Sequence, residues 1–556
     1  MSEPSKTASS GRREYVKTIG ALAAGLAVGG AVGWLTKPTE RVLETKTITE
    51  TVTKTVTAAV TGTPTAKAPW WDEYMPRPDR SLYPKYPWLR DFLKCKEGEY
   101  LYEHDWAREL DWDSIREKFK GKAINVTWEG SAVDVPEFFK PGFEKLVGCT
   151  VNVIPIPYTI LHEKIMADLV SGAGAYDIMA FYVGWGASYL PYLYDLRGLM
   201  EKYNLDMNEY HPAFRMHATG PNGEALGLIS DADMWAFCVR KNLLEKAGID
   251  KIPDTWEDVL YAIESLKPIG EKEGWYPFDA IYNAKGFCCY LSWNEIAFQW
   301  EDYKVVKPDS WEPDFIGSNG GGIEALKVYK KLIEASPPGA LSYEYPDGRE
   351  QWLSGNAAME VGWTCLPHIA MYPEVSKISP LNTDNILEVG PVPKATARRS
   401  CGVWVTTAAG IEKAAKNPEL AFLFTLYMLS QESMTIAMLQ GPSENHVGFK
   451  QVLADERVTN VSIGMKNTYK WAHTTWTTPY AQLPEHYEIG EAVGAEIYRY
   501  LDGSVKDPEV ALKNAEDAAR KILERGGYLK PGTPPPEPYN LKDWCKKHNI
   551  ELPPPP

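Results

Sequence analysis

The sequence predicts an α/β protein, and two observations carry the prediction. Between residues 124 and 181, three short apolar runs alternate with two amphipathic patterns, which indicates strands and helices in turn. Five alternating elements in so short a span are typical of a right-handed parallel sheet. After residue 240, amphipathic patterns bounded by Gly and Pro recur, which predicts a second α/β region.

The chain begins with a segment typical of export. Arg12 and Arg13 precede an uncharged, Ala- and Gly-rich stretch over residues 19–35, and the segment resembles a twin-arginine signal. No A-x-A cleavage site follows it, so we expect residues 1–36 to be retained as an anchor in the cytoplasmic membrane. A cleaved signal would instead release the protein. Residues 37–69 are rich in Thr, which predicts a solvated stalk, with the folded part outside the cytoplasm.

Composition narrows the class of ligand. The 556 residues carry a net charge of −15 and no basic stripe, which excludes nucleic acid as a partner. The chain has 20 Trp and 31 Tyr. Because aromatic faces pack against the C–H faces of sugar rings, this surplus favours carbohydrate recognition. Eight cysteines permit disulfides in an exported chain, but their pairing stays open.

Local sequence signals, such as helix caps, predict the order of the helices and strands. Glu137 follows Asp134 by three residues, as in a capping box, and Gly172 ends the pattern that Thr159 begins. We expect, in order, an extension over 70–120, a strand over 124–128, a helix from Asp134, a strand over 151–154, a helix over 159–172, a strand over 176–181, helices over 241–248, 253–266, 323–333, 419–429 and 508–523, and a proline-rich tail over 531–556.

The predicted sheet locates a site. In open parallel sheets, ligands bind beyond the carboxyl ends of the strands. The residues that follow the first and third strands combine aromatic rings with a carboxylate, which suits a polyhydroxyl ligand. We therefore expect ligand contacts from Trp128, Glu129, Gly130, Ser131, Tyr182 and Trp185.

Catalytic chemistry has no clear signature. No zinc-protease motif, nucleophile elbow or phosphate-binding loop occurs. Asp231 and Asp233 could form a glycosidase pair with Glu129 or Glu360. Acid pairs are easy to find among 74 acidic residues, however. We expect a binding protein rather than an enzyme, with no metal and no cofactor.

Four segments, in order, resemble one family. Residues 175–179 read AYDIM, residues 227–258 contain GLI, RKNLLEKAG and PDTWED, residues 353–363 read LSGNAAMEVGW, and residues 389–394 read VGPVPK. One segment alone would be a weak signal, but four in this order are specific. The chain is similar to the family-1 extracellular solute-binding proteins of ABC importers, the relatives of maltose-binding protein. The resemblance covers roughly residues 124–523.

The resemblance implies a two-lobed periplasmic-binding-protein-like fold of type II. Two parallel-type α/β lobes are then joined by hinge crossings, with the ligand between them. It assigns residues 121–230 and 395–440 to lobe 1, and residues 231–394 and 441–530 to lobe 2. The crossings would fall near residues 231–234, 391–394 and 441–448.

The resemblance also implies site residues. Trp363 would stack on the ligand, Asp231 and Asp233 would lie beside it, and Trp185 and Trp404 would line the cleft. The residues after the first strand would contact the ligand too.

The expected function is a membrane-tethered binding subunit. It would bind a carbohydrate, with an oligosaccharide favoured, and deliver it to the permease subunits of an ABC importer. Two alternatives stay open. One is the same fold with another solute, such as a peptide or a polyamine, because Glu129, Asp231, Asp233 and Glu360 would suit a cation. The other is a surface glycoside hydrolase.

Overall fold

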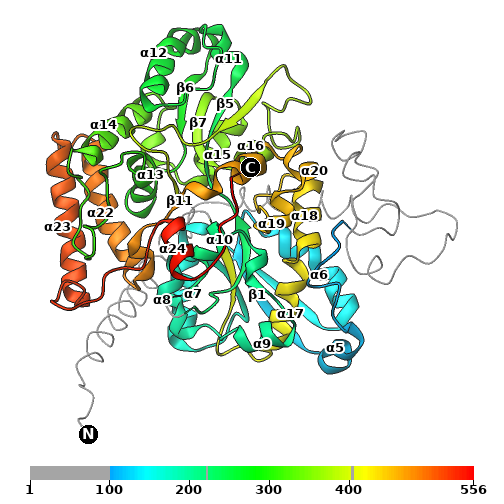
Figure 1. Cartoon of the computed structure of the whole chain (residues 1–556). Coiled ribbons are helices and arrows are strands. Elements are labelled where there is room, and N and C mark those ends of the chain that lie inside the picture. The colour runs from blue at the N-terminus through cyan, green and yellow to red at the C-terminus, as the bar shows by residue number, and fades with distance from the viewer. Residues whose placement is uncertain (1–100, 221–222, 402–405, 556) are drawn as a thin grey trace, which may run out of the picture.

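The computed structural model describes residues 101–220, 223–401 and 406–555, which form two lobes, each built on one sheet (Figure 1). The first sheet has the strand order β2-β1-β3-β10-β4. β1 pairs in parallel with β2 and β3, whereas β10 runs antiparallel to β3 and β4. Its strands are β1 (Ala123–Glu129), β2 (Thr150–Ile156), β3 (Ile178–Tyr182), β4 (Leu228–Ala232) and β10 (Thr406–Ile411).

Two helices connect the parallel strands of the first sheet. α6 (Asp134–Val147) joins β1 to β2, and α7 (Tyr158–Ser171) joins β2 to β3. α7 ends at Gly172, whose φ of 64° is a left-handed conformation that favours glycine. The predicted N-terminal caps are wrong, whereas the predicted end of α7 at Gly172 is confirmed. Asp134 is the first helical residue of α6 and Thr159 lies inside the first turn of α7, and neither helix has a side-chain cap.

The second sheet has four strands in the order β6-β7-β5-β8. β6 and β7 are parallel, but β5 runs antiparallel to β7 and β8, so both sheets are mixed rather than purely parallel. α12 (Trp256–Glu273) and α14 (Gly321–Glu334) contact β6, and Thr255 forms a capping box with Asp258 at the start of α12. The strands are β5 (Trp235–Arg240), β6 (Tyr276–Ala280), β7 (Ala357–Trp363) and β8 (Leu387–Gly390).

A helical layer flanks the second sheet. α13 (Phe287–Ala297) contacts α14 and α22 (His486–Leu501), and α22 packs along α23 (Pro508–Gly526). Figure 1 shows α22 and α23 side by side at the outer edge of the molecule, in orange and red. In α23, Leu512, Ala515 and Ala519 are fully buried. Their spacing of three to four residues gives the helix the apolar face that it packs against its neighbours.

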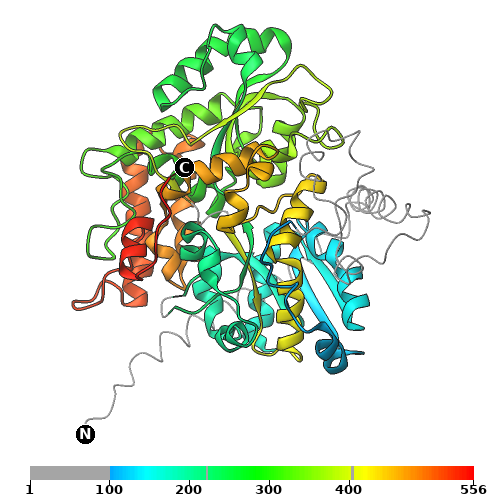
Figure 2. The same ribbon diagram turned by 45° about the vertical axis from the view of Figure 1, so that its right-hand side comes forward.

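Figure 2 shows the chain passing between the two lobes through the middle of the molecule. β4 of the first sheet leads through Asp233 and Met234 into β5 of the second. β8 leads back to β10 through residues 391–405, of which 402–405 lie outside the described residues. Residues 441–449 form the third connection, between α18 (Gln431–Gln440) and α19 (Lys450–Leu453).

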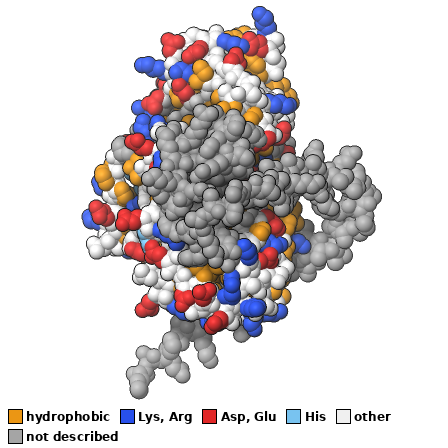
Figure 3. All heavy atoms as spheres, turned by 90° about the vertical axis from the view of Figure 1, so that its right-hand side faces the viewer, with side chains coloured by type: hydrophobic (Ala, Val, Ile, Leu, Met, Phe, Trp, Pro, Cys, Tyr) orange, Lys and Arg blue, Asp and Glu red, His pale blue; other side chains and the backbone are white. Residues whose placement is uncertain are grey.

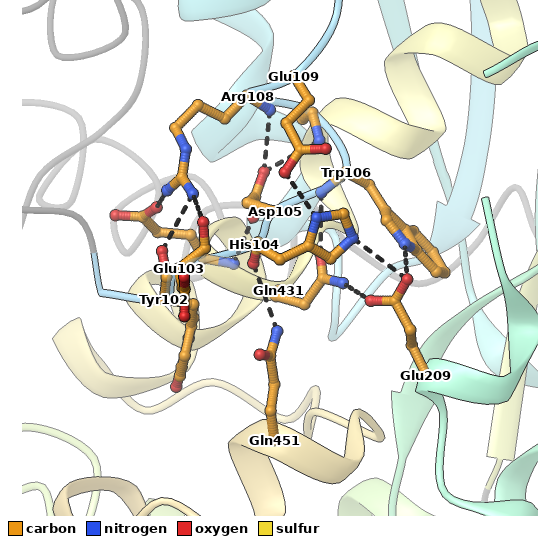
Figure 4. A network of polar contacts seen from close by, with 12 residues as sticks. Tyr102, Glu103, His104, Asp105, Trp106, Arg108, Glu109, Glu209, Gln431 and Gln451 are labelled. Carbon is orange, nitrogen blue, oxygen red and sulfur yellow. Dashed lines mark hydrogen bonds and ion pairs between the residues drawn. The ribbon is translucent and has the colours of Figure 1, made fainter. Parts of the chain in front are cut away.

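The described part of the N-terminal extension is bound to the first lobe through a polar network (Figure 4). Trp106 Nε1 donates to Glu209 at 2.7 Å, and the Trp106 backbone N–H donates to Gln431 at 3.1 Å. The Asp105 carboxylate accepts a hydrogen bond of 2.8 Å from the backbone N–H of Glu432. The extension thereby supplies acceptors to the first turn of α18, where helical N–H groups lack partners.

The C-terminal segment contacts both lobes. Trp311 Nε1 donates to the carbonyl of Pro534 at 2.9 Å. Farther on, α24 (Leu541–Lys547) packs on α10 (Pro212–His217) of the first lobe. Leu541 and Trp544 are buried in this contact. The sequence predicted a proline-rich tail and no helix here.

The surface of the described residues carries both signs of charge. Figure 3 shows Lys and Arg side chains interspersed with Asp and Glu side chains over both lobes. Within the described ranges, no helix is long and apolar enough to cross a membrane. The predicted anchor and stalk lie outside these ranges, in residues 1–69. Six cysteines with described side chains are free: Cys149, Cys238, Cys288, Cys289, Cys365 and Cys545.

Candidate functional site

A cavity lies between the two lobes, where the carboxyl ends of strands from both sheets meet. It encloses about 720 Å³ of space free of protein atoms, part of which is open to solvent. β1, β3 and β10 reach it from the first lobe and β7 reaches it from the second, while Asp233, Glu444 and Asn445 come from the connections between the lobes. Its lining residues include Trp128, Glu129, Tyr158, Tyr182, Asp231, Asp233, Tyr282, Tyr345, Trp363, Cys365, Thr407, Glu444 and Asn445.

Aromatic side chains form much of the lining. Trp363 stacks on Trp235 with ring centroids 5.1 Å apart, and Tyr345 meets Trp363 edge-on at 4.7 Å. The Tyr282 hydroxyl donates to the Tyr158 hydroxyl at 2.8 Å, which joins the second lobe to the first across the cavity. Packing from two sides therefore fixes the rings before any ligand binds, which lowers the entropy cost of binding.

Two of the cavity carboxylates share one hydroxyl. The Ser131 hydroxyl, which has one proton to donate, lies within hydrogen-bond distance of both Glu129 and Glu444, at 2.9 Å in the second case. Arg349 Nε lies 2.8 Å from the other oxygen of Glu444. Glu129 has no cationic partner among the described residues. Glu129 therefore lines the cavity as a hydrogen-bond acceptor, and among the described residues no positive charge balances it.

The other two carboxylates are held at the first crossing. The Asp233 carboxylate accepts a hydrogen bond of 2.6 Å from the Thr364 hydroxyl, and its Oδ1 lies 2.8 Å from His446 Nδ1. Asp231 accepts a hydrogen bond of 2.7 Å from the backbone N–H of His446. Asp233, Thr364 and His446 are almost fully buried. We refer to these three residues as the crossing junction.

Burial raises the pKa of three acids that line the cavity. For Glu129, burial and then the nearby charge of Glu444 raise the pKa to about 7. Burial, and then the charge of Asp233, raise the pKa of Asp231 well above its usual value. Burial also raises the pKa of Glu444, although Arg349 opposes this. Near neutral pH these acids therefore respond strongly to any charge that a ligand brings.

Two hydrogen-bond donors of the cavity have no partner among the described residues. They are Trp363 Nε1 and Asn445 Nδ2. Both side chains are buried, so a donor left without a partner lowers the stability of the folded protein. A ligand with acceptor oxygens would satisfy both donors.

Comparison with known proteins identifies the family. Residues 129–435 match the family described as bacterial extracellular solute-binding protein. The chain belongs to this family. Membership and the structure together confirm the resemblance and the two-lobed α/β fold that the sequence predicted. The protein is therefore an extracellular solute-binding protein of the ABC-transporter type.

Individual relatives of this solute-binding protein are distant. A probable amino-acid ABC transporter periplasmic-binding protein of Sinorhizobium fredii is 22% identical over 437 residues, covering 75% of this chain and 93% of the relative. The structure is similar to an Agrobacterium radiobacter solute-binding protein in complex with ribitol, with a TM-score of 0.64, 21% identity, and coverage of 73% of this chain and 99% of the other. It is also similar to maltose-bound T. maritima MalE3, with a TM-score of 0.64, 20% identity, and coverage of 72% and 100%.

The predicted site residues fall into two groups. Six line the cavity: Trp128, Glu129, Tyr182, Asp231, Asp233 and Trp363. Gly130 and Ser131 form the turn beside it, and Ser131 reaches it only through Glu129 and Glu444. Trp185 is buried behind Tyr158 and Tyr182, with ring centroids 6.1 and 5.6 Å away. Trp404 lies outside the described residues.

Glu360 does not reach the cavity. It precedes Trp363 by three positions on β7, and side chains alternate between the faces of a strand, so the two lie on opposite faces. Glu360 pairs in register with Cys238 on β5 and Asp279 on β6, and all three are fully buried. Burial raises the pKa of Glu360 to about 8. The sequence-based prediction ignored the period of the strand.

Several lining residues were missed. Tyr282 follows the carboxyl end of β6, so recognising that strand would have found it. Glu444 and Asn445 lie in the third crossing, which the resemblance located without naming these residues. Tyr158 begins α7 and Tyr345 begins α15 (Tyr345–Leu353). Nothing in the local pattern distinguishes these two tyrosines from the 29 others.

Stability of the ligand-free protein should fall as pH rises. The pKa of Glu129 is about 7 in the folded protein, against 4.5 for an ordinary Glu. Between these values the folded state binds more protons than the unfolded chain, so the free energy of unfolding decreases with rising pH. Glu129→Gln should remove part of this decrease between about pH 5 and about pH 8, as measured by urea unfolding.

The matched control for this measurement is Glu264→Gln, at an exposed position of α12. It should follow the pH profile of the wild-type protein. A Glu129→Gln variant with the wild-type slope would show that Glu129 titrates normally in the folded protein.

Proposed function

We propose that this protein is the substrate-binding subunit of an ABC importer and that it binds a carbohydrate, of oligosaccharide class, between its lobes. The bound solute would then pass to the permease subunits. The observation that carries the proposal is the cavity between the lobes, in which fixed aromatic rings alternate with carboxylates and unpartnered donors. Sugars present apolar C–H faces and hydroxyl edges, which match these two kinds of surface.

The relatives support this ligand class without deciding it. Similar structures carry names that mention ribitol and maltose as the bound molecules. Hydroxyl groups both donate and accept hydrogen bonds. They can donate to Glu129 and Asp231 while they accept from Trp363 Nε1 and Asn445 Nδ2. A purely apolar ligand would form no hydrogen bond with any of these four groups and would leave Trp363 Nε1 and Asn445 Nδ2 without a partner.

A second candidate is a nitrogen-containing solute such as a peptide or a polyamine. The specific observation in its favour is the acidic lining, with Glu129, Asp231, Asp233 and Glu444 in one cavity. The relative from Sinorhizobium fredii is named as a probable amino-acid binding protein. A bare polyamine, however, offers no acceptor to Trp363 Nε1 or Asn445 Nδ2, which favours the carbohydrate.

A hydrolase is less well supported than a binding protein. Asp231 and Asp233 belong to a crossing, where backbone and side-chain hydrogen bonds already occupy them. Among the described residues, no group of three or more His, Cys, Asp or Glu side chains could hold a catalytic metal. Members of the matching family are described as solute-binding proteins.

Binding should occur without turnover. The purified protein should gain stability with one class of neutral or charged sugars in a thermal-shift panel, by about 2.7 kcal/mol at 100 times the dissociation constant. After long incubation with the best oligosaccharide, no new reducing ends should appear. Sustained release of product over many turnovers would establish a hydrolase and reject the binding-only proposal.

Trp363→Ala should weaken ligand binding by about 10- to 100-fold, because stacking and burial of one aromatic ring contribute roughly 1–3 kcal/mol. Trp363 also packs on Trp235, so the variant should lose stability as well. Affinity is therefore measured by calorimetry well below the unfolding temperature of the variant.

The control for lost packing is Trp256→Ala, since Trp256 is buried on α12 and does not line the cavity. It should unfold more easily and bind with wild-type affinity. Equal affinities for the Trp363→Ala variant and the wild-type protein would assign Trp363 to the core alone.

We also propose that residues 1–36 tether the protein to the outer face of the cytoplasmic membrane. Support comes from Arg12, Arg13 and the uncharged stretch over residues 19–35. The protein should fractionate with membranes from its native host and retain this segment in mass spectrometry. A mature N-terminus between residues 36 and 67 on a freely released protein would instead indicate a cleaved signal.

A further inference from the structure

We propose that the ligand carries a positively charged amine on its polyhydroxyl frame, as an amino sugar does. This inference rests on the carbohydrate binding proposed above and names its subclass. The observation behind it is an imbalance of charge in the cavity. Four carboxylates line it, whereas no Lys, Arg or His is among its described lining residues.

Two of the four acids are already compensated. Arg349 Nε lies 2.8 Å from Glu444, and the ring of His446 lies 2.8 Å from Asp233. Glu129 and Asp231 receive hydrogen bonds only from Ser131 and from the backbone of His446, respectively, together with their own turns. The described residues thus leave two carboxylates of the cavity without a positive partner.

A neutral sugar would not balance these carboxylates. When a ligand fills the cavity, it displaces the water that solvates them, and a buried carboxylate without an opposite charge is costly. A hydroxyl donor offsets only part of this cost, whereas a hydrogen bond from an ammonium group is roughly twice as strong. The aromatic rings of the lining, including Trp128, Tyr158 and Tyr182, also favour a cation over their faces.

The cavity equally disfavours an amine without hydroxyl groups. Trp363 Nε1 and Asn445 Nδ2 lack partners, and both are donors. An ammonium group has only donors to offer, so it cannot satisfy them. A ligand with both an ammonium group and hydroxyl oxygens satisfies the acids and the donors together.

A bound amine should change the protonation of Glu129. An ammonium group beside Glu129 favours the ionised carboxylate, so binding should release protons and should strengthen from about pH 5 to about pH 7. A neutral sugar produces neither effect through Glu129. Other charged and titratable groups lie around the cavity and also interact with a bound charge. They include Asp134, Tyr158, Tyr182, Asp231, Asp233, Arg349, Cys365, Glu444 and His446.

The experiment compares matched ligands by calorimetry on the full folded chain. The pairs are glucosamine with glucose, and the β-1,4 glucosamine disaccharide with its N-acetylated form and with cellobiose. Spermidine is the amine without hydroxyl groups. In whichever pair binds, the free amine should bind at least about tenfold more tightly than its neutral partner. Titrations in buffers of different ionisation enthalpy should report proton release for the amine alone.

Each outcome decides between the two proposals. Equal or tighter binding of the neutral partner overturns the inference and leaves the carbohydrate assignment in place. Binding of spermidine alone overturns both, in favour of a polyamine. Failure of every sugar rejects the carbohydrate assignment, and the inference with it.

Two variants test whether Glu129 causes the preference for the amine. Glu129→Gln should reduce the ratio of amine to neutral affinity by about tenfold and diminish the proton release. Glu264→Gln, exposed on α12, should leave both unchanged. A Glu129→Gln variant that keeps the full amine preference would remove Glu129 from the recognition of charge.

Discussion

The crossing junction of Asp233, Thr364 and His446 is the interaction on which the cavity depends. Each residue comes from a different segment: the link after β4, the end of β7 and the third crossing. Met234 N–H donates to the Thr364 hydroxyl and Thr364 N–H donates to the Met234 carbonyl, so backbone and side chains are joined at one point. Because the junction is almost fully buried, its hydrogen bonds are strong and removal of one partner would be costly.

The junction explains why acids gather in the cavity. It fixes His446, whose backbone N–H binds Asp231 and whose carbonyl accepts from Ala232. The same segment carries Glu444 and Asn445 into the space between the sheets. Strands of both lobes end at this space, which is the usual place for ligands in open α/β sheets. The crossings thus supply Asp233, Glu444 and Asn445, and the strand ends supply Trp128, Glu129, Tyr182 and Trp363.

The sequence predicted those parts of the cavity lining that strand periodicity controls. Trp128, Glu129 and Tyr182 line the cavity because strand pattern and sheet topology place the ends of β1 and β3 at one edge of the sheet. Glu360 was misplaced because its face of the strand was not considered, and Tyr345 could not be found because only tertiary packing brings α15 to Trp363. Glu444 was not predicted, because the family resemblance located the third crossing but not the side chains that it contributes. Sequence patterns describe elements, whereas a site between lobes depends on how distant segments meet.

The cavity holds groups that lower the stability of the ligand-free folded protein. Carboxylates with raised pKa values and donors without partners are costly at neutral pH, and folding must overcome that cost elsewhere. The buried aromatic rings and the rest of the hydrophobic core supply the compensation. Such a cost is tolerated where it serves recognition, because each unsatisfied group is a contact that only the correct ligand can complete. Stability and specificity are therefore linked through the same few side chains.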